Sequence, residues 1–122
     1  MRRRVLIVDD SLVQTRQLSA LVTGSDAYCV AGVAHTGADG IKLFEQLRPD
    51  LVLLDVVMPV LDGLACLRAI RVMDAQVPVV LISALGAVVR TVEEAKKLGV
   101  QAIITKPYDP AEVRAALEKI FA

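Results

Sequence analysis

The chain has 122 residues, which suffices for one domain of ordinary size but not for two. Its formal net charge is zero, so it has no excess of basic residues of the kind that nucleic-acid-binding domains carry. Hydrophobic residues make up 55% of the chain and aromatic residues only 3%, so the core must consist of aliphatic side chains. The longest uncharged run, Val77–Val89, is shorter than the roughly 18 residues that a membrane span requires, so we expect a cytoplasmic protein that binds neither nucleic acid nor a membrane directly.

Short apolar runs separated by helix-like segments predict five strands. These runs are Val5–Val8, Tyr28–Ala34, Leu51–Leu54, Pro78–Ile82 and Ala102–Ile104. Every residue from Leu51 to Leu54 is apolar, so this strand should be covered on both faces, as in a parallel sheet. Because helices alternate with the strands, we expect an α/β fold with helices on both sides of a doubly wound five-stranded parallel sheet, which is a three-layer sandwich formed by residues 1–122 as one domain.

The segments between the strands carry helix-start signals. The first three helices should begin at Ser11, at Thr36 or Gly37, and at Asp62-Gly63. The last helix is the best marked, because Asp109 can cap it, Pro110 suits its first turn and Glu112 stands at the capping-box spacing. The chain therefore alternates strand and helix up to its last helix.

Polar and charged residues follow four of the predicted strands at the point where each strand ends. They are Asp9 and Asp10, Asp55, Ser83 and Lys106. Because the carboxyl ends of parallel strands share one edge of the sheet, these side chains should meet there. Two carboxylates about 5 Å apart repel by roughly 3 kcal/mol at an effective dielectric constant near 20, and one ammonium cannot neutralise three of them. Oxygen ligands with residual negative charge favour Mg²⁺, so we expect Mg²⁺ as the cofactor.

The motifs at these strand ends resemble those of a known family, and the resemblance covers nearly the whole chain. They are Val8-Asp9-Asp10-Ser11, Leu54-Asp55-Val56-Val57-Met58-Pro59, Asp62-Gly63, Ile82-Ser83-Ala84 and Thr105-Lys106-Pro107. The chain resembles the receiver domain of two-component response regulators. Its N-terminal half is most similar to receivers of chemotaxis methylesterases and sporulation-type regulators, and its length is like that of stand-alone chemotaxis regulators. The resemblance implies a flavodoxin-like sheet with strand order 2-1-3-4-5.

The resemblance also implies a phosphoacceptor and its metal ligands. Asp55 would accept a phosphoryl group from the phosphohistidine of a sensor histidine kinase or a histidine phosphotransfer protein. The side chains of Asp10 and Asp55 and the backbone carbonyl of Val57 would hold Mg²⁺, and Asp9 would act mostly through water. The domain would be a phosphorylation-controlled switch of a phosphorelay rather than an enzyme that turns over a metabolite.

Three further residues would bind or shape the phosphate site by the same resemblance. Ser83 would donate a hydrogen bond to a phosphate oxygen, and Lys106 would pair with the acyl phosphate as a point charge. The Lys106-Pro107 peptide bond would be cis. A downstream target would bind the surface of the fourth helix, fifth strand and fifth helix.

The chain departs from the family where many receivers carry an aromatic residue that moves when the domain is phosphorylated. That position is Ile103 here, and a β-branched residue can repack but cannot swing a ring. Tyr108 is the nearest aromatic; it is either a substitute for that ring or a partly exposed structural residue. His35, in the loop after the second predicted strand, we take as a solvated loop residue.

Two other protein classes fit the pattern less well. A phosphatase of the haloacid-dehalogenase type needs a second acid two residues after its aspartate nucleophile, but Val57 follows Asp55 there and Ser11 follows Asp9. A flavodoxin-like cofactor carrier needs a hydroxyl- and glycine-rich phosphate loop after its first strand, where this chain has two carboxylates. A third alternative lies within the family, because the chain could be a receiver cut from a longer regulator whose output domain is missing.

The positions that flank the attacking water in this family are apolar here. They are Val57, two residues after Asp55, and Leu85, two residues after Ser83. Because neither side chain can orient a water molecule, we predict slow self-dephosphorylation. The lifetime of the phosphorylated protein, followed with Mg²⁺ and without a phosphatase, checks this, and a lifetime of seconds would contradict it.

Overall fold

Five parallel strands form the sheet at the centre of the computed structural model, which describes residues 2–56, 63–84 and 89–121. The strands are β1 (Arg3–Val8), β2 (Tyr28–Ala34), β3 (Leu51–Asp55), β4 (Val79–Ala84) and β5 (Ala102–Lys106). Their order across the sheet is β2-β1-β3-β4-β5, and every neighbouring pair is parallel. The predicted fold class and strand order are confirmed.

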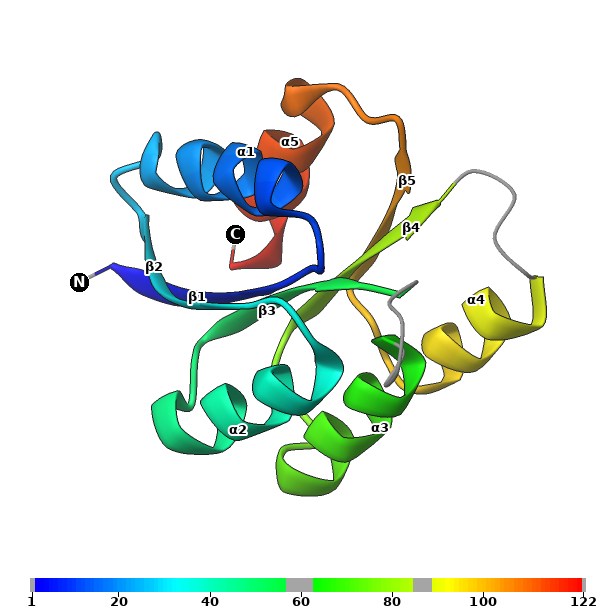
Figure 1. Cartoon of the computed structure of the whole chain (residues 1–122). Helices are drawn as coiled ribbons and strands as arrows, with labels where there is room; N and C mark the ends of the chain where they lie inside the picture. The colour runs from blue at the N-terminus through cyan, green and yellow to red at the C-terminus, as the bar shows by residue number, and fades with distance from the viewer. Residues whose placement is uncertain (1, 57–62, 85–88, 122) are drawn as a thin grey trace.

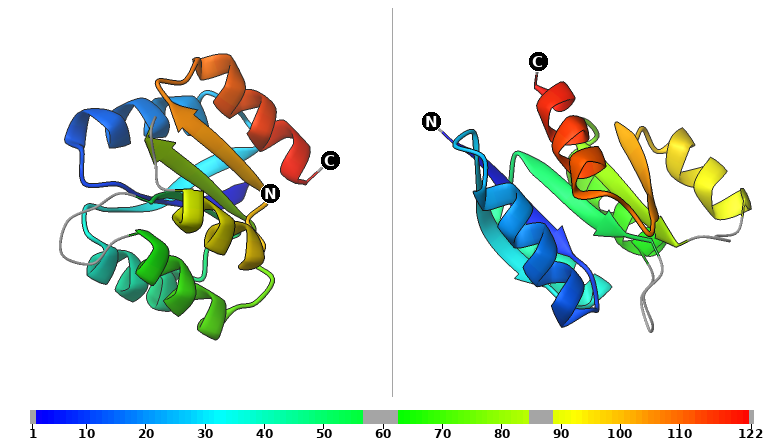
Figure 2. Two further views of the ribbon diagram at one scale, coloured as in Figure 1. Left: turned by 90° about the vertical axis from the view of Figure 1, so that its right-hand side faces the viewer. Right: turned by 90° about the horizontal axis from the view of Figure 1, so that it is seen from above.

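Helices cover both faces of this sheet. They are α1 (Leu12–Thr23), α2 (Gly37–Leu47), α3 (Gly63–Met73), α4 (Val89–Lys97) and α5 (Pro110–Ile120). Helices α1 and α5 lie on one face, and α2, α3 and α4 lie on the other (Figures 1 and 2). This is the three-layer sandwich that the alternation of strands and helices predicts. Among the described residues, no helix combines the length and the apolar character that crossing a membrane would require.

The central strand β3 is buried along its whole length, as its uninterrupted apolar run predicts. Its side chains alternate between the two faces of the sheet. Val52 and Leu54 pack into the cluster beneath α2 and α3, whereas Leu51 and Leu53 pack into the cluster beneath α1 and α5. The strand therefore holds its last residue, Asp55, on a support that is packed from both sides.

Side-chain caps fix where three helices begin. Ser11 accepts a hydrogen bond from the backbone of Gln14 at the start of α1, and Thr36 accepts one from Asp39 at the start of α2. Asp109 caps α5 in a complete capping box, with Pro110 in the first turn. These caps are the ones expected from the residue types, and Thr36 rather than Gly37 is the cap of α2.

Strands β1 and β5 are longer than apolar content predicts. Strand β1 begins at Arg3, which pairs with Tyr28 and places its guanidinium 4.1 Å from the centre of the Phe121 ring. Strand β5 continues through Thr105 to Lys106, because both residues pair with β4. Ladder pairing extends both strands into polar residues, so hydrophobicity alone starts β1 too late and ends β5 too early.

Arg71 ties the end of α3 to the segment that joins α4 to β5. Its guanidinium donates hydrogen bonds to the backbone carbonyls of Leu98 at 2.6 Å, Val77 at 2.8 Å, Gly99 at 3.2 Å and Asp74 at 3.3 Å. The planar fork of donors can reach carbonyls on both segments at once, which a single ammonium cannot do. Arg71 therefore stabilises the packing of α4's C-terminal end against α3.

We expect Arg71→Lys to lower the free energy of unfolding by roughly 1–3 kcal/mol, because partly buried carbonyls lose their donors. Urea unfolding followed by circular dichroism measures this. The matched control is Arg68→Lys on the same helix, whose ion pair with Glu94 is exposed and should contribute less than about 1 kcal/mol. Equal losses for the two variants would contradict the role given to Arg71.

Candidate functional site at the carboxyl ends of the strands

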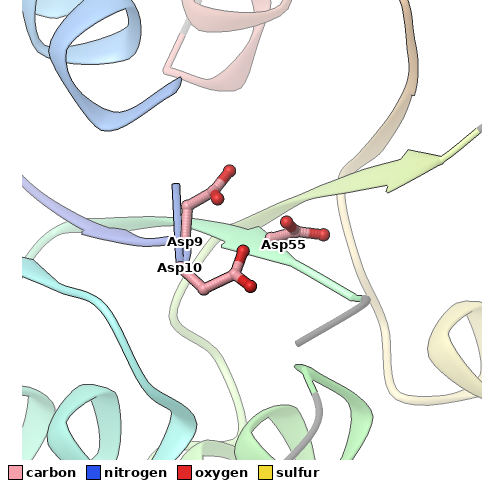
Figure 3. A group of neighbouring side chains, drawn as sticks. All are labelled: Asp9, Asp10 and Asp55. Atoms are coloured by element: carbon pink, nitrogen blue, oxygen red, sulfur yellow. The ribbon is translucent and has the colours of Figure 1, made fainter. Parts of the chain in front are cut away.

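Three carboxylates meet at the carboxyl edge of the sheet. Asp9 and Asp10 follow β1, and Asp55 is the last residue of β3. The register pairs Val8 with Leu54, so the two strands end side by side. One carboxylate oxygen from each aspartate lies within 4.8 Å of the others (Figure 3). The predicted convergence of these three carboxylates is observed.

Lys106 brings one positive charge to this cluster from the end of β5. Its Nζ atom donates a hydrogen bond to Asp55 Oδ2 at 3.0 Å and lies 3.6 Å from Asp9 Oδ2. Burial lowers the pKa of Lys106, but the hydrogen bond and charge of Asp55, followed by the charge of Asp9, outweigh it and leave that pKa above its ordinary value. The amine therefore stays charged and compensates part of the negative charge.

Asp9 is the most constrained of the three acids. It is fully buried, and its Oδ1 atom accepts a hydrogen bond from the Ser11 amide at 2.9 Å. Its Oδ2 atom is buried without a hydrogen-bond partner among the described residues. Desolvation raises the pKa of Asp9 from 3.8 to about 6; the Ser11 hydrogen bond opposes this rise, and the negative charge of Asp55 adds to it. A buried anionic oxygen of this kind, next to two other carboxylates, fits a bound divalent cation.

Ser83 also lies at this edge. It is only 2% exposed, and its position in β4 directly follows Ile82, which pairs with Asp55. Its hydroxyl donates a hydrogen bond to the carbonyl of Ala84 at 3.3 Å, which is a long and weak contact. The hydroxyl can therefore turn toward a better acceptor without a large loss.

The start of α3 packs directly on the backbone beside Asp55. A Cβ atom on Gly63 would lie 2.0 Å from the Asp55 carbonyl oxygen and 2.4 Å from the Val56 Cα, and the Gly63 amide donates to the Val56 carbonyl at 3.1 Å. Only glycine permits this approach. From sequence, Asp62-Gly63 indicates no more than a helix start.

The residues that the structure describes do not include Val57, Met58, Pro59, Asp62, Leu85 and Val88.

The surroundings of the site include contacts that the sequence did not indicate. His35 is exposed, as expected, but its Nδ1 atom lies 3.2 Å from the backbone oxygen of Asp9. Tyr108 is half-buried and its hydroxyl is hydrogen-bonded to the side chain of Gln14. The Lys106-Pro107 peptide bond, by contrast, is cis as the resemblance implies.

Ile103 packs away from the acidic edge. It is half-buried against the cluster beneath α2 and α3. Its position on β5 is opposite Leu81 of β4. An aliphatic side chain there completes the core, and it has no polar group with which to respond to charge.

Known proteins resemble this chain in sequence and in fold. The family model "Response regulator receiver domain" matches residues 5–118. The chemotaxis protein CheY of Thermotoga maritima is 34% identical over 120 residues, which cover 98% of each chain. A protein-glutamate methylesterase/protein-glutamine glutaminase of Trichodesmium erythraeum is 39% identical over 96% of this chain, which spans 34% of that protein. A chain of the CheX–CheY–BeF3–Mg²⁺ complex from Borrelia burgdorferi superposes with a TM-score of 0.90 at 32% identity, covering 98% of this chain and 90% of that one.

The doubly wound sheet and its edge of three aspartates and one lysine define a receiver fold of the CheY and CheB kind. The chain belongs to the response regulator receiver domain family.

The raised pKa of Asp9 makes the metal-free protein more stable in acid. The folded state keeps a proton on Asp9 up to about pH 6, whereas the unfolded chain loses it near pH 3.8, so this contribution is complete below about pH 4 and is lost as the pH rises through 6. We therefore expect Asp9→Asn to become more stable than the parent, by roughly 2–3 kcal/mol, as the pH rises from 4 to 7.

Urea unfolding in the presence of a chelator, at several pH values, measures this difference. Asp26→Asn is the matched control, because Asp26 is exposed and far from the site along the chain. Its difference from the parent supplies the baseline against which the effect of Asp9→Asn is compared. A pH-independent difference for Asp9→Asn would show that the Asp9 carboxylate is not destabilising.

Proposed function

We propose that this domain accepts a phosphoryl group on Asp55 from the phosphohistidine of a sensor histidine kinase or a histidine phosphotransfer protein, and thereby switches its interaction with a target. The observation that carries the proposal is the position of Asp55. It is 3% exposed, it ends the central strand, and it lies with two other carboxylates and the Lys106 amine in a chain of the receiver family.

The residues around Asp55 suit phosphoryl transfer, which needs positioning and charge neutralisation. An oxygen of Asp55 attacks the phosphorus atom, the phosphorus–nitrogen bond to the donor histidine breaks, and the imidazole nitrogen keeps the electron pair and takes a proton from water. The product is an acyl phosphate on Asp55. Lys106, 3.0 Å from the carboxylate, pairs with its negative oxygens, and the weakly bonded Ser83 hydroxyl turns to donate to one of them.

The metal ion that this chemistry uses is Mg²⁺. Asp10, Asp55 and the backbone carbonyl of Val57 would hold it, and Asp9 would act mostly through water. When bound, Mg²⁺ neutralises the carboxylates and the charge of the incoming phosphoryl group. The Asp9 Oδ2 atom, which is buried without a hydrogen-bond partner among the described residues, and the grouping of the three carboxylates support this assignment (Figure 3). The related CheX–CheY complex of Borrelia burgdorferi includes Mg²⁺.

The target would bind the surface formed by α4, β5 and α5. Arg90, Lys96 and Lys97 are exposed on α4, which gives this surface a basic side. The Borrelia burgdorferi complex pairs a CheY with the protein CheX, so a protein partner suits this kind of domain. We assign no nucleic acid or membrane as a direct partner, and we place the domain, residues 1–122, in the cytoplasm. It acts either alone, like the CheY proteins, or as the receiver part of a longer regulator, like the methylesterases.

We expect Asp55→Asn to abolish phosphorylation by acetyl phosphate, because the amide lacks the nucleophilic oxygen. Intact-protein mass spectrometry should show one added phosphoryl group on the parent protein when Mg²⁺ is present and far less when it is chelated. Asp26→Asn, at an exposed position outside the site, should be phosphorylated like the parent. Phosphate incorporation into Asp55→Asn at the parent rate would refute the assignment of Asp55.

A further inference from the structure

A hydrogen bond joins the first turn of α1 to the loop that follows β5. The side-chain amide of Gln14 donates to the hydroxyl of Tyr108, across a sequence separation of 94 residues. Tyr108 follows Lys106 and the cis-Pro107 at the end of the sheet. Neither Gln14 nor Tyr108 belongs to the acidic cluster, but both lie on segments that lead into it.

These contacts form a closed ring around the site. Asp9 accepts a hydrogen bond from the Ser11 amide, and Ser11 caps the helix turn that carries Gln14. Gln14 is bonded to Tyr108, which is separated from Lys106 by Pro107 alone. Lys106 returns to Asp9 at 3.6 Å. Within this ring, the Gln14–Tyr108 bond is therefore the contact outside the ionic cluster that joins the start of α1 to the loop after β5.

Packing holds the Tyr108 ring only in part. The ring contacts the core cluster beneath α1 and α5, but it also lines two surface hollows of about 370 and 460 Å³. Lys106 lines the first of these hollows together with Gln14. Burial, and then the negative charge of Asp9, raise the pKa of Tyr108, which places the ring within the field of the acidic site. Without the hydrogen bond, the ring and the loop that carries it have room to move.

We propose that Gln14 and Tyr108 are positioning residues that hold Lys106 over the carboxylates, and that their hydrogen bond sets the rate at which Asp55 is phosphorylated. This inference rests on the function proposed above, and it assigns a role to residues that would not touch the phosphoryl group. The strand β5 fixes the Lys106 backbone from one side. The bond from α1 to Tyr108 fixes it from the other, so that the amine stays near the position where phosphate charge develops.

The test is a double-mutant cycle with Gln14→Leu and Tyr108→Phe, which remove the donor and the acceptor while keeping most of the volume. Each variant should be phosphorylated by acetyl phosphate roughly three- to tenfold more slowly than the parent, in line with the loss of one hydrogen bond. The double variant should be no slower than the slower single variant, because both changes break the same bond. The affinity for Mg²⁺, measured by titration calorimetry, should change less than about twofold, because the carboxylates are untouched.

Tyr28→Phe is the matched control. It removes the only other tyrosine hydroxyl of the chain, which is buried and bonded to the carbonyl of Leu117 far from the acidic edge. This variant should lower the melting temperature but leave the phosphorylation rate unchanged. That result separates a general loss of stability from an effect on Lys106.

Three results would overturn the inference while the parent protein is still phosphorylated on Asp55. They are parent-like rates for both single variants, losses that multiply in the double variant, and a fall in Mg²⁺ affinity that parallels the fall in rate. If the parent protein itself takes up no phosphate on Asp55, the proposed function fails first, and the positioning role fails with it. Parent-like rates for the variants alone leave the proposed function intact.

Discussion

Like charges held close together at one edge of a rigid sheet are the constraint on which this structure depends. Three carboxylates lie within 4.8 Å of one another, and one amine opposes them. The parallel register makes this unavoidable, because strands that end side by side bring their last residues together. Desolvation by burial, and after it the negative charge of Asp55, raise the pKa of Asp9, so this arrangement disfavours the charged form of that carboxyl. Under the proposed function, such a site would gain from binding a cation and then a phosphoryl group, whose oxygens the amine and the serine hydroxyl would bind.

The rest of the fold keeps this unfavourable arrangement from relaxing. Strand β3 is buried on both faces, so Asp55 cannot withdraw from its neighbours without disrupting two packed clusters. Gly63 brings α3 against the Asp55 backbone more closely than any residue with a side chain could. The stability that offsets this repulsion comes from the aliphatic core and from hydrogen bonds such as those of Arg71, which lies away from the acidic edge. Stability and reactivity thus reside in different parts of the molecule.

The sequence alone predicts the layers, the strand positions and the convergence of the acids, because each depends on local apolar patterns and on the geometry of parallel strands. It does not predict the contacts that depend on how distant loops and rotamers meet. The Gln14–Tyr108 bond and the contact of His35 with the Asp9 carbonyl join residues far apart in the chain, and neither has a local pattern. The close approach of Gly63 is of the same kind, because a glycine before a helix indicates a turn without saying which backbone lies against it.

The position of Ile103 bears on how a structural change at Asp55 could be transmitted to other parts of the domain. A movement of Lys106 can pass back along β5 to Ile103, or forward through Pro107 to Tyr108. Along β5 it meets an aliphatic side chain packed against the core, which has no polar group with which to respond to charge. Forward, it meets an aromatic ring beside open hollows, joined by one polar bond to α1. A single directional bond with free space beside it breaks more easily than a packed core rearranges, so under the proposed function a change of charge at Asp55 would reach α1 by the forward route, when this bond is broken.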